Sequence, residues 1–153
     1  MLIEVKAKVA WKIDGKVKKK TETFILDKEV FAQAELGVMS FLQAKNNSGT
    51  VENYEITGLR LSAIKEIITQ YEGENTFIAT LRDTVLIDDA EKQVKYKVLL
   101  WANSITEAMN HAKEVASQGY DMQIDGLREV SYTYLNYDSD ESETPENTEP
   151  EGA

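Results

Sequence analysis

The sequence predicts an α+β protein built from two consecutive β-β-α-β repeats, and three observations support this prediction. A strand-then-helix pattern over 24–42 recurs 74 positions later, over 98–116, without a gap. After the helix the offset falls to 68, where Ile-Thr-Gly-Leu-Arg at 56–60 aligns with Ile-Asp-Gly-Leu-Arg at 124–128. The same side of the helix is apolar in both copies. A fixed period with one shortened loop is typical of a duplicated supersecondary unit.

Each repeat begins with two strands joined by a tight turn. Residues 3–11 alternate between apolar and polar side chains, which is the period of a half-buried strand. Asp14-Gly15 is a hairpin signal, and the returning strand is expected from about 17 to 26. In the second repeat Asp88 stands at the position of Asp14. The residues of the first returning strand that point away from the core are Lys19, Thr21, Thr23 and Ile25.

One helix follows each hairpin, and its apolar side chains recur with a period of 3.6 on the same face in both copies. These side chains are Phe31, Ala34, Val38, Phe41 and Leu42 in the first helix and Ile105, Ala108, Ala112, Val115 and Ala116 in the second. Ser104 with Glu107 makes a capping box ahead of the second helix, and Glu29 precedes the first. Phe31 and Ile105 are therefore expected in the core.

A third strand is expected near 52–61 in the first repeat and within 121–135 in the second. Gly58 and Gly126 occupy equivalent positions on these strands. Glycine inside a strand commonly marks a bulge or a bend, so this pair predicts a bulge or bend shared by both repeats.

The segment 62–71 has two interpretations. A helix is favoured by an apolar stripe, which consists of Leu61, Ile64, Ile68 and Tyr71. A strand is favoured by the equivalent segment 130–134, Val-Ser-Tyr-Thr-Tyr, which has strand-forming residues throughout. The repeat therefore favours extended structure through about Ile67.

The two repeats, about 3–70 and 75–137, are expected to form a single domain over 1–137. Because each helix has one apolar stripe, both helices are expected on one face of a mostly antiparallel sheet of about six strands. The other face would be open to water unless a partner covers it. Residues 138–153 carry no base and are expected to form a disordered acidic tail. Its seven acids are Asp138, Asp140, Glu141, Glu143, Glu146, Glu149 and Glu151.

Composition excludes several classes of protein. At 153 residues the chain is long enough for a real core, and no apolar run approaches the roughly 18 residues of a membrane helix. The chain has no cysteine, which rules out disulfides and thiolate chemistry and fits a cytoplasmic protein. The formal net charge is −10, but without the seven acids of the tail the remaining chain carries only about −3. The acidity is largely a property of the tail.

Three stretches resemble a known family. They are Glu-Ile-Thr-Gly-Leu-Arg at 55–60, the strand and hairpin over 77–88, and Leu-Trp-Ala-Asn-Ser-Ile-Thr-Glu-Ala at 100–108. The resemblance covers about 3–137 and is to a domain family of unknown function, about 150 residues long, from Bacteroides-group bacteria and their phages. It implies a bacterial or phage setting, and no activity or functional residue.

Catalytic and metal-binding motifs are missing from the sequence. The one histidine, His111, has no second histidine or cysteine as a partner, and we interpret it as a residue at the flank of the helix. Asp83, Asp88 and Asp89 could be oxygen ligands, but the alignment of Asp88 with Asp14 favours a hairpin turn. No phosphate loop, nucleophile motif or dinucleotide fingerprint occurs. We therefore expect no enzyme, no cofactor and no metal site.

One group of residues indicates a possible ligand, and most of its members are basic. By strand alternation seven residues share the outward sheet face with threonines, and these candidate site residues are Lys6, Lys8, Lys19, Arg82, Lys95, Lys97 and Trp101. Amines that follow phosphates and a ring that stacks on bases are the ingredients of single-strand recognition. The best hypothesis is a single-stranded nucleic-acid-binding protein, such as a replication accessory, whose acidic tail competes for the basic face.

The lysines and the acidic tail also have simpler interpretations. Lysines commonly protect exposed sheets from aggregation, and an acidic tail can be a simple solubiliser. The alternative function is a protein-protein or assembly adaptor that presents its open sheet face. Expected partners are therefore single-stranded nucleic acid, proteins bound through the acidic tail, or a second copy of the chain, and not a membrane.

Overall fold

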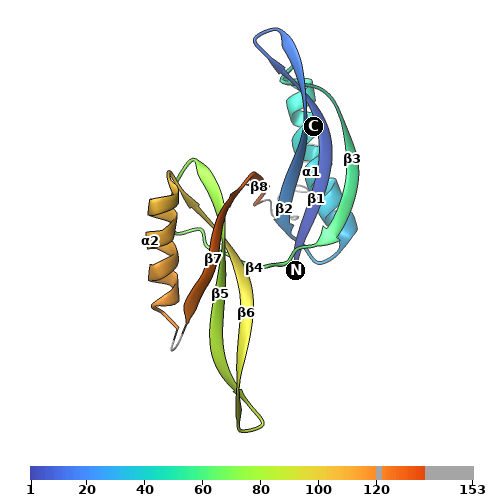
Figure 1. Cartoon of the computed structure of the whole chain (residues 1–153). Helices are drawn as coiled ribbons and strands as arrows, with labels where there is room; N and C mark the ends of the chain where they lie inside the picture. Colours follow the sequence, from blue (N-terminus) through green and yellow to red (C-terminus); the bar gives the residue numbers. More distant parts are fainter. Residues whose placement is uncertain (120–121, 137–153) are drawn as a thin grey trace, which may run out of the picture. The chain divides into compact units, whose positions relative to one another are not determined.

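The computed structural model describes residues 1–119 and 122–136 and has the predicted α+β class. The expected tail over 138–153 lies outside the described residues. The elements, labelled in Figure 1, are β1 (Leu2–Ile13), β2 (Lys16–Asp27), α1 (Phe31–Asn47), β3 (Val51–Leu61), β4 (Ile64–Ile67), β5 (Asn75–Ile87), β6 (Ala90–Ala102), α2 (Ile105–Ala116), β7 (Gln123–Val130) and β8 (Tyr132–Tyr134).

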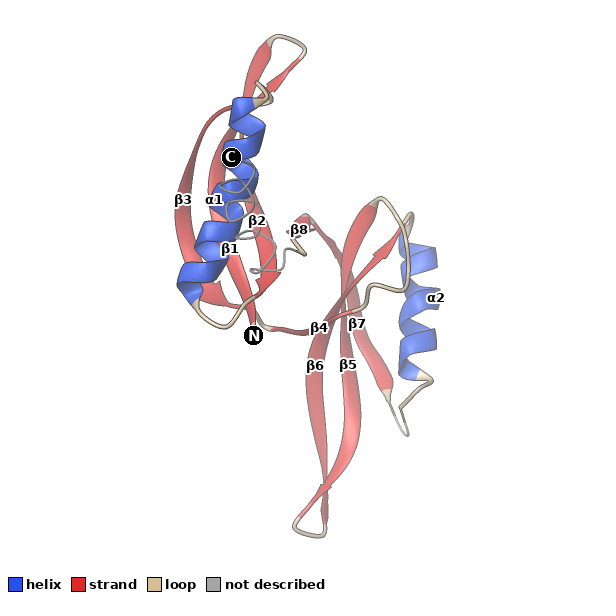
Figure 2. Ribbon diagram, turned by 180° about the vertical axis from the view of Figure 1, so that it is seen from behind, coloured by secondary structure: helices blue, strands red, loops and turns tan. Residues whose placement is uncertain are grey.

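The described chain divides into two compact units. The first unit holds Met1–Ser62 together with the described residues from Tyr132 onward, and the second holds Ala63–Ser131. Each unit has a four-stranded sheet, in the order β3-β1-β2-β8 for the first and β4-β6-β5-β7 for the second. The strands thus form two sheets and not the single sheet of about six strands that the sequence suggested. One helix, about 10 Å wide, covers two or three strands spaced 4.8 Å apart, so each helix covers one small sheet (Figure 2).

The hairpins of the two units pair in the same register. Val5 lies opposite Phe24 on β1 and β2, and Ala79 lies opposite Val98 on β5 and β6. Both turns place two residues at positive φ, as a two-residue type I′ turn requires. These are Asp14 (51°) and Gly15 (77°) in the first unit and Asp88 (52°) and Asp89 (64°) in the second. The turn interpretation of Asp88 is confirmed.

A β-bulge occurs at the same place in both units. Lys6 pairs with Gly58 while Ala7 pairs with Ile56, so Thr57 is the extra residue on β3. On β7 the register likewise shifts between Thr80 and Leu81, which pair with Gly126 and Ile124, and Asp125 is the extra residue. The bulge predicted from the two glycines is therefore confirmed.

The fourth strand of each sheet comes from the other repeat. Strand β4 runs parallel to β6, with Ile64 opposite Lys97, and β8 runs parallel to β2, with Tyr132 opposite Thr23. Extended structure through Ile67 is thus confirmed. The chain crosses from the first unit to the second after Ser62 and returns after residue 131. The repeats therefore exchange their last strands.

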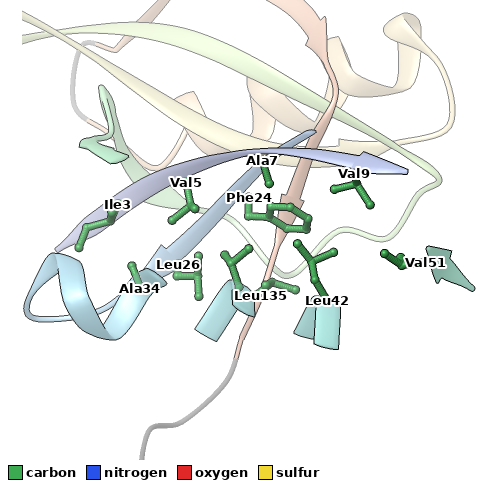
Figure 3. Packing of buried hydrophobic residues seen from close by; sticks show 11 residues of the cluster. Ile3, Val5, Ala7, Val9, Phe24, Leu26, Ala34, Leu42, Val51 and Leu135 are labelled. Carbon is green, nitrogen blue, oxygen red and sulfur yellow. The ribbon is translucent and has the colours of Figure 1, made fainter. Parts of the chain in front are cut away.

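Each unit has its own core, built where the apolar side of the helix meets the alternating side chains of the sheet. In the first unit Ala34, Val38 and Leu42 are fully buried on α1, and Leu135, which follows β8, lies among them and their β1 and β2 neighbours (Figure 3). In the second unit Ile68, which follows β4, joins a cluster whose other buried members are Phe77, Ala79, Leu81, Val98, Leu100, Ala102, Ala108 and Ala112.

Two predictions about the helix starts have different outcomes. The Ser104 cap is confirmed, since Ser104 Oγ accepts the Glu107 N–H at 3.1 Å, while the Glu107 carboxylate accepts from the Asn103 N–H at 3.0 Å. Val30 caps α1 without a side-chain hydrogen bond. The burial of Phe31 and Ile105 was wrong, because these side chains are 42% and 57% exposed. Both residues are the first of their helix, and burial begins three positions later.

The outer face of each sheet, which we define as the face opposite its helix, is only partly open. Ile25 was expected to point to solvent, yet it is fully buried. Its neighbour across the strands, Glu4, is 2% exposed. The equivalent pair in the second unit, Ile78 and Leu99, is 3% and 0% exposed. Alternation placed Ile25 on the correct face, but it did not reveal that this part of the face is buried.

Candidate nucleic-acid interface

The seven candidate residues lie on outer faces, as strand alternation predicted, but on two different sheets. Lys6 and Lys8 on β1 alternate with buried Val5, Ala7 and Val9, which fixes them on the outer face of the first sheet. Lys19 joins them from β2. The outer face of the second sheet carries Arg82 from β5 and Lys95, Lys97 and Trp101 from β6.

On the first sheet the three lysines are exposed. Lys6 lies opposite Thr23, Lys8 opposite Thr21, and Lys19 opposite Ala10 on neighbouring strands. None of the three forms an ion pair with another described residue. Their ammonium groups are therefore available to an external anion.

A hollow of about 460 Å³ lies beside Lys8 and Lys19. Strands β1, β2 and β3 line it, with the residues Lys8, Val9, Ala10, Lys19, Lys20, Thr21, Asn53, Tyr54 and Glu55. On the outer face it therefore presents two ammonium groups, a hydroxyl, an amide and one carboxylate. The ammonium, hydroxyl and amide groups can bind a small anion through charge and hydrogen bonds, while the carboxylate repels it.

On the second sheet, two of the cations are already paired. The Asp125 carboxylate lies 3.3 Å from Arg82 Nε and 3.5 Å from Lys95 Nζ. Arg82 also donates to Gln123 Oε1 at 2.6 Å and to Gln93 Oε1 at 3.3 Å. These contacts hold Arg82 in a closed network, which the sequence did not predict.

The other two candidates of the second sheet are partly buried. Lys97 lies opposite Thr80 on β5 and is flanked on its other side by Ile64 of β4. Trp101 lies opposite Thr76 near the end of β6, and its backbone oxygen is 3.1 Å from His111 Nδ1. Both residues keep some exposed surface for a ligand.

Sequence reasoning missed an ion pair on the first outer face, in which the carboxylate is buried and the arginine is exposed. Arg60 donates from Nε to Glu4 Oε1 at 2.9 Å, and its Nη2 lies 2.7 Å from the same oxygen. Ser62 Oγ donates to Glu4 Oε2 at 2.7 Å. The hydrogen bond and charge of Glu4 raise the pKa of the Arg60 guanidinium. The available signal was a carboxylate at a position whose counterpart in the second repeat, Ile78, is apolar.

The contacts of His111 are structural. Its ring stacks on Tyr71 with centroids 4.0 Å apart and planes 5° apart, and its Nδ1 is within hydrogen-bond distance of the Trp101 oxygen. The Tyr71 hydroxyl donates to Glu114, and burial is the main cause of the raised pKa of Tyr71. In the described part of the chain, no three histidine, aspartate or glutamate side chains are grouped so that they could hold a metal ion.

These features define an α+β protein of two sheet-and-helix units with charged outer faces. Residues 2–134 match the model of a family described as a domain of unknown function, DUF4494, and the chain belongs to this family. No curated protein and no solved structure gives a significant match. Within the described ranges, no helix is both long and apolar enough to cross a membrane.

Proposed function

We propose that the protein binds single-stranded nucleic acid through the outer faces of its sheets and performs no catalysis. One observation carries the proposal: Lys6, Lys8 and Lys19 stand exposed on one sheet face, without ion pairs to other described residues. Lys8 and Lys19 also line a hollow large enough for a phosphate group. Lysines on a sheet follow the phosphate backbone without reading base sequence, so binding would depend weakly on sequence and strongly on salt.

The second outer face supplies what the first lacks, an aromatic ring. Trp101 stacks on a base in this proposal, and Lys97 neutralises a neighbouring phosphate. Base stacking on an aromatic side chain typically contributes about 1–3 kcal/mol. The fluorescence of Trp101 should therefore be quenched when a single strand binds.

The acidic tail opposes binding in this proposal. In the sequence, residues 138–153 follow β8 after three residues, and β8 pairs with β2 of the unit that carries the three exposed lysines. The seven acids of the tail would therefore compete with phosphates at high local concentration.

The test is fluorescence anisotropy of a labelled single strand at low ionic strength, followed by a salt series. Lys6→Glu combined with Lys97→Glu should abolish binding without unfolding the protein, because neither side chain belongs to a core. Lys45→Glu combined with Lys113→Glu changes the net charge equally, on the helices, and is the matched control. Equal loss in both double variants, or no binding by the wild-type chain, contradicts the proposal.

A second candidate function, an assembly adaptor, is favoured by a different observation. Exposed apolar side chains gather toward the ends of the two hairpins, and they are Ile13, Val17, Leu86, Ile87 and Val94. Such residues suit contact with another protein or with a second copy of the chain. A pulldown from native lysate with and without nuclease separates the two functions, since partners that survive nuclease favour the adaptor.

The proposed setting follows from the resemblance and from composition. A replication-type accessory in the cytoplasm of a bacterium, or of a bacterium infected by a phage, would meet single strands continually. This setting, and the source among Bacteroides-group organisms, stay predictions.

A further inference from the structure

The two bulges carry different residues at the same structural position. Thr57 is the extra residue on β3, directly before Gly58, and Asp125 is the extra residue on β7, directly before Gly126. The second unit therefore has a carboxylate where the first unit has a hydroxyl.

In the second unit the Asp125 carboxylate occupies the place of a bound anion. It lies 3.3 Å from Arg82 Nε and 3.5 Å from Lys95 Nζ, on the outer face of the sheet. Gln93 and Gln123 complete the surroundings of Arg82. This part of the second face is an anion site that is filled from within the chain.

The corresponding part of the first unit has the same kind of cation but no internal anion bound to it. By strand register Lys8 corresponds to Arg82, Lys19 to Gln93 and Glu55 to Gln123. These three residues line the hollow of about 460 Å³. The Thr57 hydroxyl contacts the Lys6 carbonyl oxygen at 3.4 Å and brings no charge. Glu55, the one acid of the hollow, forms no ion pair with another described residue within 4.0 Å.

We propose that the hollow between β1, β2 and β3 is a phosphate site, with Lys8 and Lys19 as its cations and Thr21 and Asn53 as its neutral hydrogen-bonding groups. Asp125 closes the equivalent site of the second unit. The inference rests on the proposed function and deepens it: a single strand would place a backbone phosphate in the hollow of the first unit alone. The bulge residue thus decides which unit has an open phosphate site at this position.

The test is an NMR titration of the full chain at low ionic strength, first with inorganic pyrophosphate and then with a thymidine oligonucleotide. Both probes should shift the signals of Lys8, Lys19 and Asn53. If pyrophosphate shifts these signals and the oligonucleotide does not bind, the phosphate site stands and the proposed function is wrong. If the oligonucleotide binds elsewhere and leaves these signals unchanged, the proposed function stands and the phosphate site is wrong. If neither probe shifts any signal of the protein, both proposals are wrong.

Reciprocal variants of the bulge residues test the mechanism. Thr57→Asp should weaken pyrophosphate binding at least about tenfold, because it places a like charge beside the phosphate. Thr57→Asn is the control, with a similar shape and no charge, and should bind as the wild type does.

Asp125→Thr should create new pyrophosphate shifts at Arg82 and Lys95. Lys19→Gln, at an exposed position, should also weaken binding and remains informative if the bulge variants misfold. Unchanged affinity in Thr57→Asp and Lys19→Gln contradicts the site.

Discussion

Arg60 neutralises a carboxylate that water does not reach. Its Nη2 lies 2.7 Å from Glu4 Oε1; the Glu4 side chain is 2% exposed, whereas that of Arg60 is 63% exposed. A buried carboxylate is costly unless it is paired and hydrogen-bonded, and Ser62 supplies one further donor. Arg60 is therefore the main reason that a charge is tolerated at this position.

Arg60→Ala should lower the free energy of unfolding by about 2–3 kcal/mol, because it leaves Glu4 buried without its cation. The value is below the usual range for a fully buried pair, since Arg60 itself is exposed and Ser62 remains. Arg128→Ala is the matched control: it removes the equivalent arginine beside Ile78 and should change stability by less than about 0.5 kcal/mol. Urea unfolding of both variants checks this, and equal losses would contradict it.

Two large residues of α1 should differ in how much their replacement by alanine lowers the free energy of unfolding, because one is buried and the other is exposed. Leu42→Ala should cost about 2–5 kcal/mol, because Leu42 is fully buried in the core of the first unit. Phe31→Ala should cost less than about 1 kcal/mol, because its ring is 42% exposed. Urea unfolding followed by circular dichroism measures both. A larger loss for Phe31→Ala than for Leu42→Ala would show that the helix is placed incorrectly.

Much of the fold could be predicted from the sequence because local patterns determine it. Alternation located the strands, the 3.6 period located the buried stripes at Ala34 and Ala108, and two glycines located the bulges. Pairing between distant segments leaves no such pattern. Four-residue β4 and three-residue β8 pair in parallel with strands of the other repeat, and only the global packing decides this exchange.

The sequence predicted on which sheet face each candidate residue lies, but it did not predict which residues each one contacts. Alternation assigned Lys8 and Arg82 correctly to outer faces. It could not reveal that Arg82 is held by Asp125, because the acid reaches that face only through the bulge. The pairing of Glu4 was equally hidden, since its partner Arg60 lies 56 residues away in the sequence.

Tyrosine burial predicts a loss of stability in alkaline solution. Burial is the main cause that raises the pKa values of Tyr96 and Tyr134 above the ordinary 10.0; the charges of Asp83 and Asp27, respectively, raise them further. Above pH 10.0 the unfolded chain loses these protons first, so stability falls as pH rises toward the folded pKa values. Urea midpoints between about pH 9 and pH 11 should decrease, and Tyr96→Phe should reduce the decrease. The same decrease in that variant would contradict the assignment.

The strand exchange predicts that a mutation in one repeat will destabilise the sheet of the other. Leu135 belongs to the second repeat in sequence, yet it packs in the core of the first unit. Leu135→Ala should therefore cost about 2–5 kcal/mol and reduce the hydrogen-exchange protection of β1 amides before those of β5. Ile68→Ala should show the opposite order, because Ile68 packs in the second unit. If each variant loosened the sheet of its own repeat, the exchange would be wrong.

Removal of the acidic tail should strengthen binding of a single strand. Truncation after Tyr137 deletes the seven acids of 138–153, and the full chain has a net charge of −10. Without this competing polyanion we expect affinity for a labelled single strand to rise about tenfold at low salt. The salt dependence should steepen, because more counterions are then released from phosphates by free lysines such as Lys8.

The control keeps the length of the tail and replaces its acids by Asn and Gln; it should match the truncation. Anisotropy titrations at several salt concentrations measure both effects. A truncated chain that binds no better than the full chain would show that the tail does not compete for the outer face.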